Sequence, residues 1–283
     1  MTDGRNYPQG VPCWVDTEQP DPDAARRFYG ELFGWSFADA VPADAPGSYW
    51  IASLDGQDVA ALAPGGDGPV AWNTYVAVDD AEASAALVVA NGGAIGSAPQ
   101  DAGPGGRAAS CTDPSGAPFR LWQARGRLGA QLVNAPGAWN FSDLHTDDPE
   151  RAKAFYAAVF GWEADELDLG GGMTATMWRR PGYGDHLEAT VDPEIRARQS
   201  DIQAPPGFED AVAWLLPLAG NAASPHWHVT FAVADRDDSV AVAERLGAAV
   251  VSTEDSDWTR SAQVRDPQGA ELTLSQFAPS AAA

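Results

Sequence analysis

A histidine flanked by two carboxylates is the strongest candidate for proton transfer in this sequence of 283 residues. His145 stands two residues after Asp143 and two before Asp147. Within the strand expected here only Asp143 shares its side, because side chains two apart point the same way. Imidazole titrates near neutral pH and a carboxylate fixes its tautomer, so the pair predicts general acid/base catalysis. Alternatively, Asp143 or Asp147 caps the following helix and His145 makes a structural hydrogen bond.

Other catalytic patterns are missing. The Gly-rich stretches 64–69, 102–107 and 169–173 lack the GxGxxG and Walker spacings, and no GxSxG motif occurs. Neither Cys13 nor Cys111 has a nearby histidine in sequence. Two cysteines without a CxxC pair predict neither a disulfide nor a thiolate–zinc framework, and they favour a reducing cytoplasm.

Composition narrows the class of partner. The chain has 40 Asp and Glu against 17 Lys and Arg, a net charge of -23. This charge argues against nucleic acid and anionic membrane surfaces, which need clustered cations. No apolar run reaches the roughly 18–20 residues of a membrane span, and the first ten residues lack a signal-peptide core. We therefore expect a cytoplasmic protein with a small-molecule ligand.

The elements that must position these residues repeat along the chain. Residues 20–35 (PDPDAARRFYGELFGW) resemble 147–162 (DDPERAKAFYAAVFGW), and 76–94 resemble 231–249. A third pair is TDPSGAPFRLWQ at 112–123 and RDPQGAELTLSQ at 265–276. The same three patterns recur in the same order, which indicates an internal duplication.

Each half contains two smaller units of order βαβββ. Strands are expected at 12–18 and 139–146, each followed by an amphipathic helix. Asp21 or Asp23 suits the N-cap of the first helix, with Pro22 in its first turn and Gly34 at its C′ position. Four such units predict an α+β fold.

The two halves define the expected domains. The first covers 12–125 and the second 138–278, joined by a Gly/Ala-rich linker at 126–137. The second half is longer because of an insertion at about 179–207, with a short helix expected at 192–200. An insertion of this length is either a functional lid, to which Tyr183 and His186 would contribute, or a surface loop.

Tandem βαβββ units with an FY…FGW helix and a DPxG turn before the last strand resemble the vicinal oxygen chelate superfamily. That group includes glyoxalase I, bleomycin-resistance proteins and extradiol dioxygenases. The chain is most similar to the two-domain, glyoxalase-like proteins of actinobacteria. The resemblance implies curved, half-open barrel sheets around a cavity in which a metal chelates two substrate oxygens.

The positions that hold the metal in the superfamily carry other residue types here. The resemblance places Trp14 and Phe141 at the first ligand position, Asn73 and His228 at the second, and Arg120 and Thr273 at the third. Only His228 is a ligand type, so we predict no metal and no other cofactor. A shifted set of His226, His228 and Glu271 is the alternative, since His226 shares a strand face with His228 and Glu271 shares one with Thr273.

Strand parity then identifies the cavity wall. The predicted substrate-binding residues are aromatic with a few polar groups, which suits a planar organic ligand: Trp14, Asp16, Phe141, Asn73, Tyr75, Trp122, His228 and Thr273. Arg120 is expected either to bind a substrate oxyanion or to neutralise Asp16.

These observations predict an enzyme that acts on an aromatic or polycyclic small molecule by metal-independent acid/base chemistry, in the lyase or isomerase class. His145, Asp143 and Arg120 are the predicted catalytic residues. The Ala-, Gly- and Asp-rich composition suits a high-GC actinomycete, where proteins of this family often accompany secondary metabolism. Two alternatives stay open. One is a sequestering protein of the drug-resistance type, and the other is a metal-dependent dioxygenase or lyase. Either a monomer or a homodimer fits four units in one chain.

Overall fold

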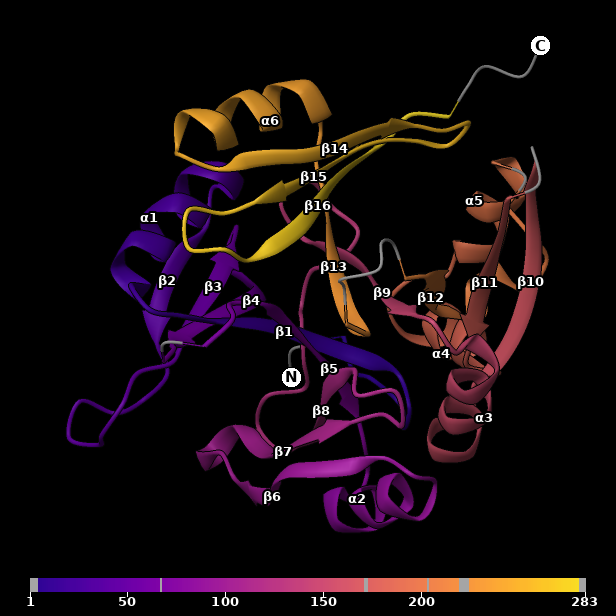
Figure 1. The fold of residues 1–283 in the computed structure, drawn as a ribbon, viewed down its shortest axis with the longest axis horizontal. Coiled ribbons are helices and arrows are strands. Elements are labelled where there is room, and N and C mark those ends of the chain that lie inside the picture. Colours follow the sequence, from indigo (N-terminus) through magenta and orange to yellow (C-terminus); the bar gives the residue numbers. More distant parts are fainter. Residues whose placement is uncertain (1–4, 67, 171–172, 203, 219–223, 280–283) are drawn as a thin grey trace. The chain divides into compact units, whose positions relative to one another are not determined.

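The computed structural model describes residues 5–66, 68–170, 173–202, 204–218 and 224–279. Four βαβββ modules follow one another, as predicted (Figure 1). The first two modules comprise β1 (Pro12–Gln19), α1 (Pro22–Phe33), β2 (Ser36–Asp39), β3 (Trp50–Leu54), β4 (Gln57–Pro64), β5 (Trp72–Ala77), α2 (Ala81–Ala90), β6 (Ala94–Asp101), β7 (Gly106–Thr112) and β8 (Pro118–Ala124), with a 3-10 turn η1 at Gly103–Gly105.

The second pair of modules repeats this order with extra helices. It comprises β9 (Trp139–Thr146), α3 (Pro149–Phe160), β10 (Glu163–Gly170), β11 (Met173–Arg179), α4 (Tyr183–Thr190), α5 (Ile195–Asp201), η2 (Phe208–Asp210), β12 (Ala211–Pro217), β13 (His226–Ala232), α6 (Arg236–Arg245), β14 (Ala249–Asp255), β15 (Thr259–Arg265) and β16 (Glu271–Phe277). The insertion therefore forms α4 and α5 rather than the single helix expected at 192–200.

Helix α1 begins and ends where the sequence predicts. Asp21 caps α1 by accepting a hydrogen bond from the Ala24 amide, Pro22 lies in the first turn, and Gly34 ends the helix in the left-handed region. That conformation costs glycine nothing, because glycine has no Cβ to clash. Asp148 is the cap of α3. Neither Asp143 nor Asp147 caps this helix, so that alternative explanation of the two carboxylates is wrong.

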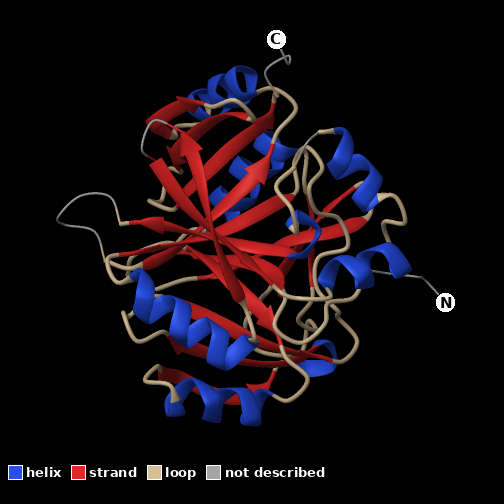
Figure 2. Cartoon of the chain, turned by 90° about the vertical axis from the view of Figure 1, so that its right-hand side faces the viewer, coloured by secondary structure: helices blue, strands red, loops and turns tan. Residues whose placement is uncertain are grey.

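Each half of the chain forms one mixed sheet of eight strands. The strand orders are β2-β3-β4-β1-β5-β8-β7-β6 and β10-β11-β12-β9-β13-β16-β15-β14. The first and last strands of each order do not pair with each other, so neither sheet closes into a barrel, in keeping with the curved, half-open sheets expected. The predicted α+β class is confirmed. More residues lie in strands than in helices, and the helices are short (Figure 2). No helix in the described ranges is long and apolar enough to cross a membrane.

The modules group differently in the two compact units of the chain. The first unit contains the residues up to Cys13, Thr74–Gly129 and Ser142–Trp227, and thus the second and third modules. The second unit contains Trp14–Asn73, Ala130–Phe141 and the residues from His228 on, and thus the first and fourth modules. Helix α2 packs on α3, and α1 packs on α6 (Figure 1). The domain boundaries 12–125 and 138–278 follow the sheets and stay a prediction.

A buried tyrosine joins the two modules of each unit. In the second unit the Tyr29 hydroxyl of α1 donates to Asp266 Oδ2 of the fourth module at 2.7 Å. In the first unit the Tyr156 hydroxyl of α3 lies 3.4 Å from Asp113 Oδ2 of the second module. Each hydroxyl also accepts a hydrogen bond from an indole, Trp72 or Trp227 respectively. The FY helix and the DPxG turn of the repeats are thus the two halves of one contact.

Replacing Tyr29 with Phe tests this contact. Burial and Asp266 raise the pKa of Tyr29, so its hydroxyl keeps its proton and donates to the carboxylate. Tyr29→Phe should lower the free energy of unfolding by about 1–3 kcal/mol, the cost of removing a buried hydrogen bond to a charged group. Tyr156→Phe is the matched control and should cost less because its contact is longer. Urea unfolding followed by tryptophan fluorescence measures both; an equal or larger loss for Tyr156→Phe would contradict the assignment.

Candidate functional site

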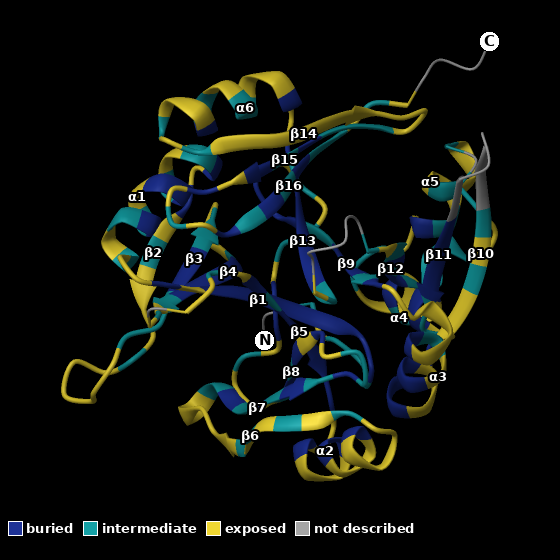
Figure 3. Ribbon diagram, viewed as in Figure 1, coloured by how far each residue is buried: buried dark blue, intermediate teal, exposed yellow. Residues whose placement is uncertain are grey.

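Buried and half-buried side chains alternate along strands β8, β9 and β16. In β8, Arg120 and Trp122 are half-buried while Phe119 and Leu121 are buried, and β9 and β16 show the same pattern. The buried set of β8 and β9 packs with α2 and α3 in the core of the first unit. We call the side of these strands that carries the half-buried set the open face. Strand β14, in contrast, is exposed along its whole length (Figure 3).

The predicted proton-transfer pair lies on the open face of β9. Asp143 and His145 are both half-buried and alternate with the buried Ser142 and Leu144. The His145 ring stacks on the His226 ring at the start of β13, with centroids 4.9 Å apart and planes 12° apart. His226 Nδ1 lies 2.8 Å from the Ser224 carbonyl oxygen. Sequence reasoning considered His226 only as an alternative metal ligand and missed this stack.

The stack and burial hold His145 neutral. Burial, with a smaller contribution from the neighbouring charge of His226, lowers the pKa of His145 from 6.5 to about 4. A buried imidazole loses the hydration that stabilises its cation, so the neutral form is favoured. At neutral pH, His145 therefore offers an unprotonated ring nitrogen on the open face.

Strand β12 adds an aromatic side chain next to this pair. It runs parallel to β9 with Trp214 opposite Asp143 and Leu216 opposite His145. Residues at the same register of parallel strands point to the same face, so Trp214 belongs to the open face. Sequence reasoning did not single out Trp214, because its neighbours depend on the pairing of β12 with β9.

Other predicted wall residues of the second sheet lie in the second unit. His228 is buried, and its Nε2 lies 2.8 Å from the Thr273 hydroxyl. Thr230 is also buried and stands opposite Thr273 in the parallel pairing of β13 with β16. Phe141 is half-buried at the start of β9. The imidazole of His228 is thus engaged by a hydroxyl.

On the first sheet a buried carboxylate forms the centre of a hydrogen-bond network. Asp16 is fully buried and accepts hydrogen bonds from Asn73 Nδ2 and the Tyr49 hydroxyl, each at 2.9 Å. The Tyr49 hydroxyl in turn accepts one from Trp14 Nε1 at 2.9 Å. The sequence predicted Trp14, Asp16 and Asn73 for the wall but missed Tyr49, which precedes β3.

Arg120 lies on the same sheet, in the first unit, beside two aromatic rings. Its guanidinium donates to the Tyr75 hydroxyl at 2.8 Å and lies 5.4 Å from the centre of that ring. Tyr75 meets Trp122 edge to face at 6.4 Å. The predicted catalytic residues therefore belong to two sheets, with Arg120 on the first and Asp143 and His145 on the second.

The residues at the superfamily's ligand positions do not fit a metal ion. Trp, Phe, Asn, Arg and Thr stand at five of them, and the sixth, His228, bonds to Thr273. Within the described ranges, no group of three His, Cys, Asp or Glu side chains is placed to hold a metal. In the alternative set, Glu271 accepts hydrogen bonds from Gln263 at 2.8 Å and Arg265 at 2.6 Å. His226, His228 and Glu271 thus form no ligand group.

Tyr183 of the insertion and the two cysteines do not belong to the open face. Tyr183 is buried with Leu187 and Ile195 in the core of the first unit, so α4 and α5 are anchored there. Burial raises the pKa of Cys13 and raises that of Cys111 to about 12, so neither thiol ionises near neutral pH.

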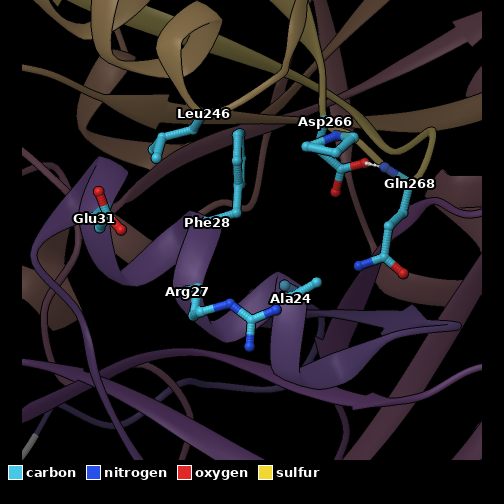
Figure 4. Close-up of a pocket in the computed structure, with 9 residues that line it drawn as sticks. Ala24, Arg27, Phe28, Glu31, Leu246, Asp266 and Gln268 are labelled. Atoms are coloured by element: carbon cyan, nitrogen blue, oxygen red, sulfur yellow. Dashed lines mark hydrogen bonds between the residues drawn. The ribbon is translucent and has the colours of Figure 1, made fainter.

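A pocket of about 290 Å³ lies away from the predicted wall (Figure 4). It is formed by α1, the end of α6 and the turn before β16, and contains Arg27, Phe28, Glu31 and Gln268. The Gln268 amide donates to Asp266 Oδ1 at 2.9 Å, and the Gln268 side chain bonds to the backbone of Asp21. The pocket lies at the interface of the first and fourth modules.

Two family profiles cover most of the chain. The glyoxalase/bleomycin resistance protein/dioxygenase superfamily matches residues 19–121, and a glyoxalase-like domain matches residues 139–275. The chain therefore belongs to this superfamily.

Particular relatives span nearly the whole sequence. The putative glyoxylase CFP32 of Mycobacterium tuberculosis is 37% identical over 281 residues, covering 96% of this chain and 97% of the relative. The anthracycline biosynthesis protein DnrV of Streptomyces peucetius is 33% identical over 285 residues, covering 95% and 94%.

Solved structures show the same fold at low sequence identity. A Mn(II)-bound glyoxalase from Novosphingobium aromaticivorans has a TM-score of 0.59 at 18% identity and covers 95% of this chain and 82% of its own. The 2,2',3-trihydroxybiphenyl 1,2-dioxygenase of Sphingomonas wittichii has a TM-score of 0.59 at 14% identity, covering 95% and 91%. The likeness extends to the fold alone.

The low pKa of His145 predicts acid sensitivity. Because the folded-state pKa is about 4 and the ordinary value is 6.5, the unfolded chain binds a proton first as the pH falls. His145 should thus cost up to about 3 kcal/mol of stability between pH 6.5 and 4, and nothing above pH 7. His145→Gln should lose less stability than wild type over this range, as urea unfolding at pH 7 and pH 4 would show. His186→Gln, in α4, is the control; equal losses in both variants would contradict the shift.

Proposed function

We propose that this protein is an enzyme that moves protons on an aromatic or polycyclic small molecule without a metal ion. The observation that carries the proposal is the neutral imidazole of His145 on the open face of β9, beside Asp143 and stacked on His226. The side chains at the superfamily's ligand positions, which do not fit a metal, support it.

The chemistry follows from the state of His145. Its unprotonated nitrogen takes a proton from a carbon next to a substrate carbonyl, and the electron pair of the C–H bond passes to the carbonyl oxygen as an enolate. The imidazolium then returns the proton to a different atom of the substrate, which completes an isomerisation. Asp143, on the same face, stabilises the cation while it exists. No oxidant or reductant takes part.

Arg120 offers a positive charge to a ligand on the first sheet. Its guanidinium donates to the Tyr75 hydroxyl and lies 5.4 Å from the centre of that ring, and this charge can hold a phenolate or enolate oxygen. Asn73, in the second unit, holds Asp16 in place. We therefore assign Arg120 to substrate binding and leave proton transfer to His145 and Asp143.

One relative supports this class of substrate. DnrV is named as an anthracycline biosynthesis protein, and anthracyclines are polycyclic aromatic compounds. A role in secondary metabolism is thus proposed for this chain as well.

A second candidate is a protein that sequesters such a compound. It is favoured by the aromatic side chains near Arg120, since the Arg120 guanidinium lies over the Tyr75 ring and Tyr75 meets Trp122 edge to face. Aromatic walls with few polar groups bind planar ligands without chemistry. The two candidate functions differ in whether the bound compound is chemically changed.

Substitution of His145 tests the enzyme. Polycyclic aromatic ketones would be incubated with the protein in D2O, and exchange of their acidic C–H followed by NMR. Wild type should accelerate exchange of at least one ketone, and His145→Gln should lose about 10²-fold or more of the acceleration. Because the neutral imidazole is the active form, the rate should fall only as the pH drops towards 4.

His186→Gln is the control and should keep the wild-type rate. Full exchange activity in His145→Gln would refute the assignment of the base. Tight binding of the ketones with no exchange by wild type would favour sequestration.

Metal content tests the second part of the proposal. Protein purified without chelator should contain less than about 0.1 equivalent of any transition metal, and dialysis against EDTA should leave the exchange rate unchanged, because no ligand set is present. A rate that EDTA abolishes and added Mn²⁺ restores would instead establish a metal-dependent enzyme.

A further inference from the structure

Trp214 occupies a place on the open face that neither the superfamily match nor the sequence patterns assign. It stands at the register of Asp143 in the parallel pairing of β12 with β9 and is half-buried, whereas its neighbours Ala213 and Leu215 are buried. On its other side, β11 brings the buried Met177 to the same register. The indole thus combines an apolar support with partial access to solvent.

The insertion places a second ring against this indole. Phe208, in the turn η2, lies with its ring centroid 6.3 Å from that of Trp214, at an angle of 44°. The turn is fixed to the insertion, because Asp210 accepts a hydrogen bond from the Gly184 amide of α4 at 2.7 Å and its carbonyl accepts one from the Arg180 amide at 2.8 Å. The extra residues of the second half therefore hold Phe208 beside Trp214.

The internal duplication gives a built-in comparison. On the first sheet Asp16 pairs with Ala61 at the register where Asp143 pairs with Trp214 on the second. The same backbone arrangement thus accepts a methyl group in one half and an indole in the other. The fold itself does not require a ring at this register, so the indole is a feature of the second sheet and its insertion.

We propose that Trp214, supported by Phe208, is the surface on which a flat, fused aromatic ring of the ligand stacks. Indole is the largest aromatic side chain, and stacking on it favours planar π-systems. A ring stacked there places its edge towards Asp143 and His145, at the neighbouring strand. The class of ligand named in this inference rests on the proposed function. The inference adds that the Trp214 surface is the part of the site that selects the ligand by its shape.

Binding of 1,4-dihydroxyanthraquinone to the full chain tests the stacking surface. Calorimetric titration should show about 10-fold weaker binding for Trp214→Ala and binding within about 3-fold of wild type for Trp214→Phe, which keeps a ring. Phe208→Ala should fall between them, because the indole stays but loses its support. Trp258→Ala removes an exposed indole from the turn between β14 and β15 and should leave the affinity unchanged.

A second readout does not depend on the alanine variant. The difference between the emission spectra of wild type and Trp214→Phe is the fluorescence of Trp214, and the bound quinone should quench it. Wild-type affinity in a folded Trp214→Ala variant, an unquenched difference spectrum, or no binding of the quinone to wild type would each overturn the proposal.

The outcome is separable from that of the proposed function. His145→Gln should lose far less affinity for the quinone than Trp214→Ala does, since the ring stacks on the indole and stacking needs no proton transfer. Loss of affinity in Trp214→Ala, with exchange activity unaffected in His145→Gln, would keep the stacking surface and refute the enzyme mechanism. The reverse pattern would refute the stacking surface alone.

Discussion

The hydrogen bond between a helix tyrosine and the aspartate of a DPxG turn is the contact on which the arrangement of modules depends. Tyr29 reaches Asp266, and Tyr156 reaches Asp113, so each bond joins a module of one sheet to a module of the other sheet. A buried carboxylate is costly unless its oxygens are bonded, and the backbone amides of the turn provide the remaining donors. The same contact appears in both units and fixes the strands that carry the open face.

Local structure follows directly from the sequence, because its causes are local. The Asp21 cap, the proline after it and Gly34 set the bounds of α1 within a few residues. Alternation in β8 and β9 separates core from open face, and two-residue periodicity alone was enough to place Asp143 and His145 together. The repeats likewise led to four βαβββ modules and to the superfamily.

What the sequence did not show depends on contacts between distant elements. Tyr49 lies 33 residues from Asp16, and its hydroxyl completes the network only after β3 pairs with β4. His226 reaches His145 across more than 80 residues, and this approach helps to lower the pKa of His145. Trp214 became a candidate only once the register of β12 and β9 was known. The spacing of residues along the chain does not reveal which of these side chains lie close together in the fold.

The two sheets of the duplicated fold surround equivalent aspartates with different side chains. At equivalent registers Asp16 is sealed by Asn73 and Tyr49, while Asp143 stands on a half-buried face with an imidazole two residues away. A carboxylate that accepts fixed hydrogen bonds is held in place, whereas one beside a neutral histidine can stabilise a transient cation. At the adjoining register the first sheet has Ala61 and the second sheet has Trp214. The second sheet therefore combines a half-buried carboxylate, an imidazole with a low pKa and an indole, and this combination is the basis of the acid/base chemistry that we propose.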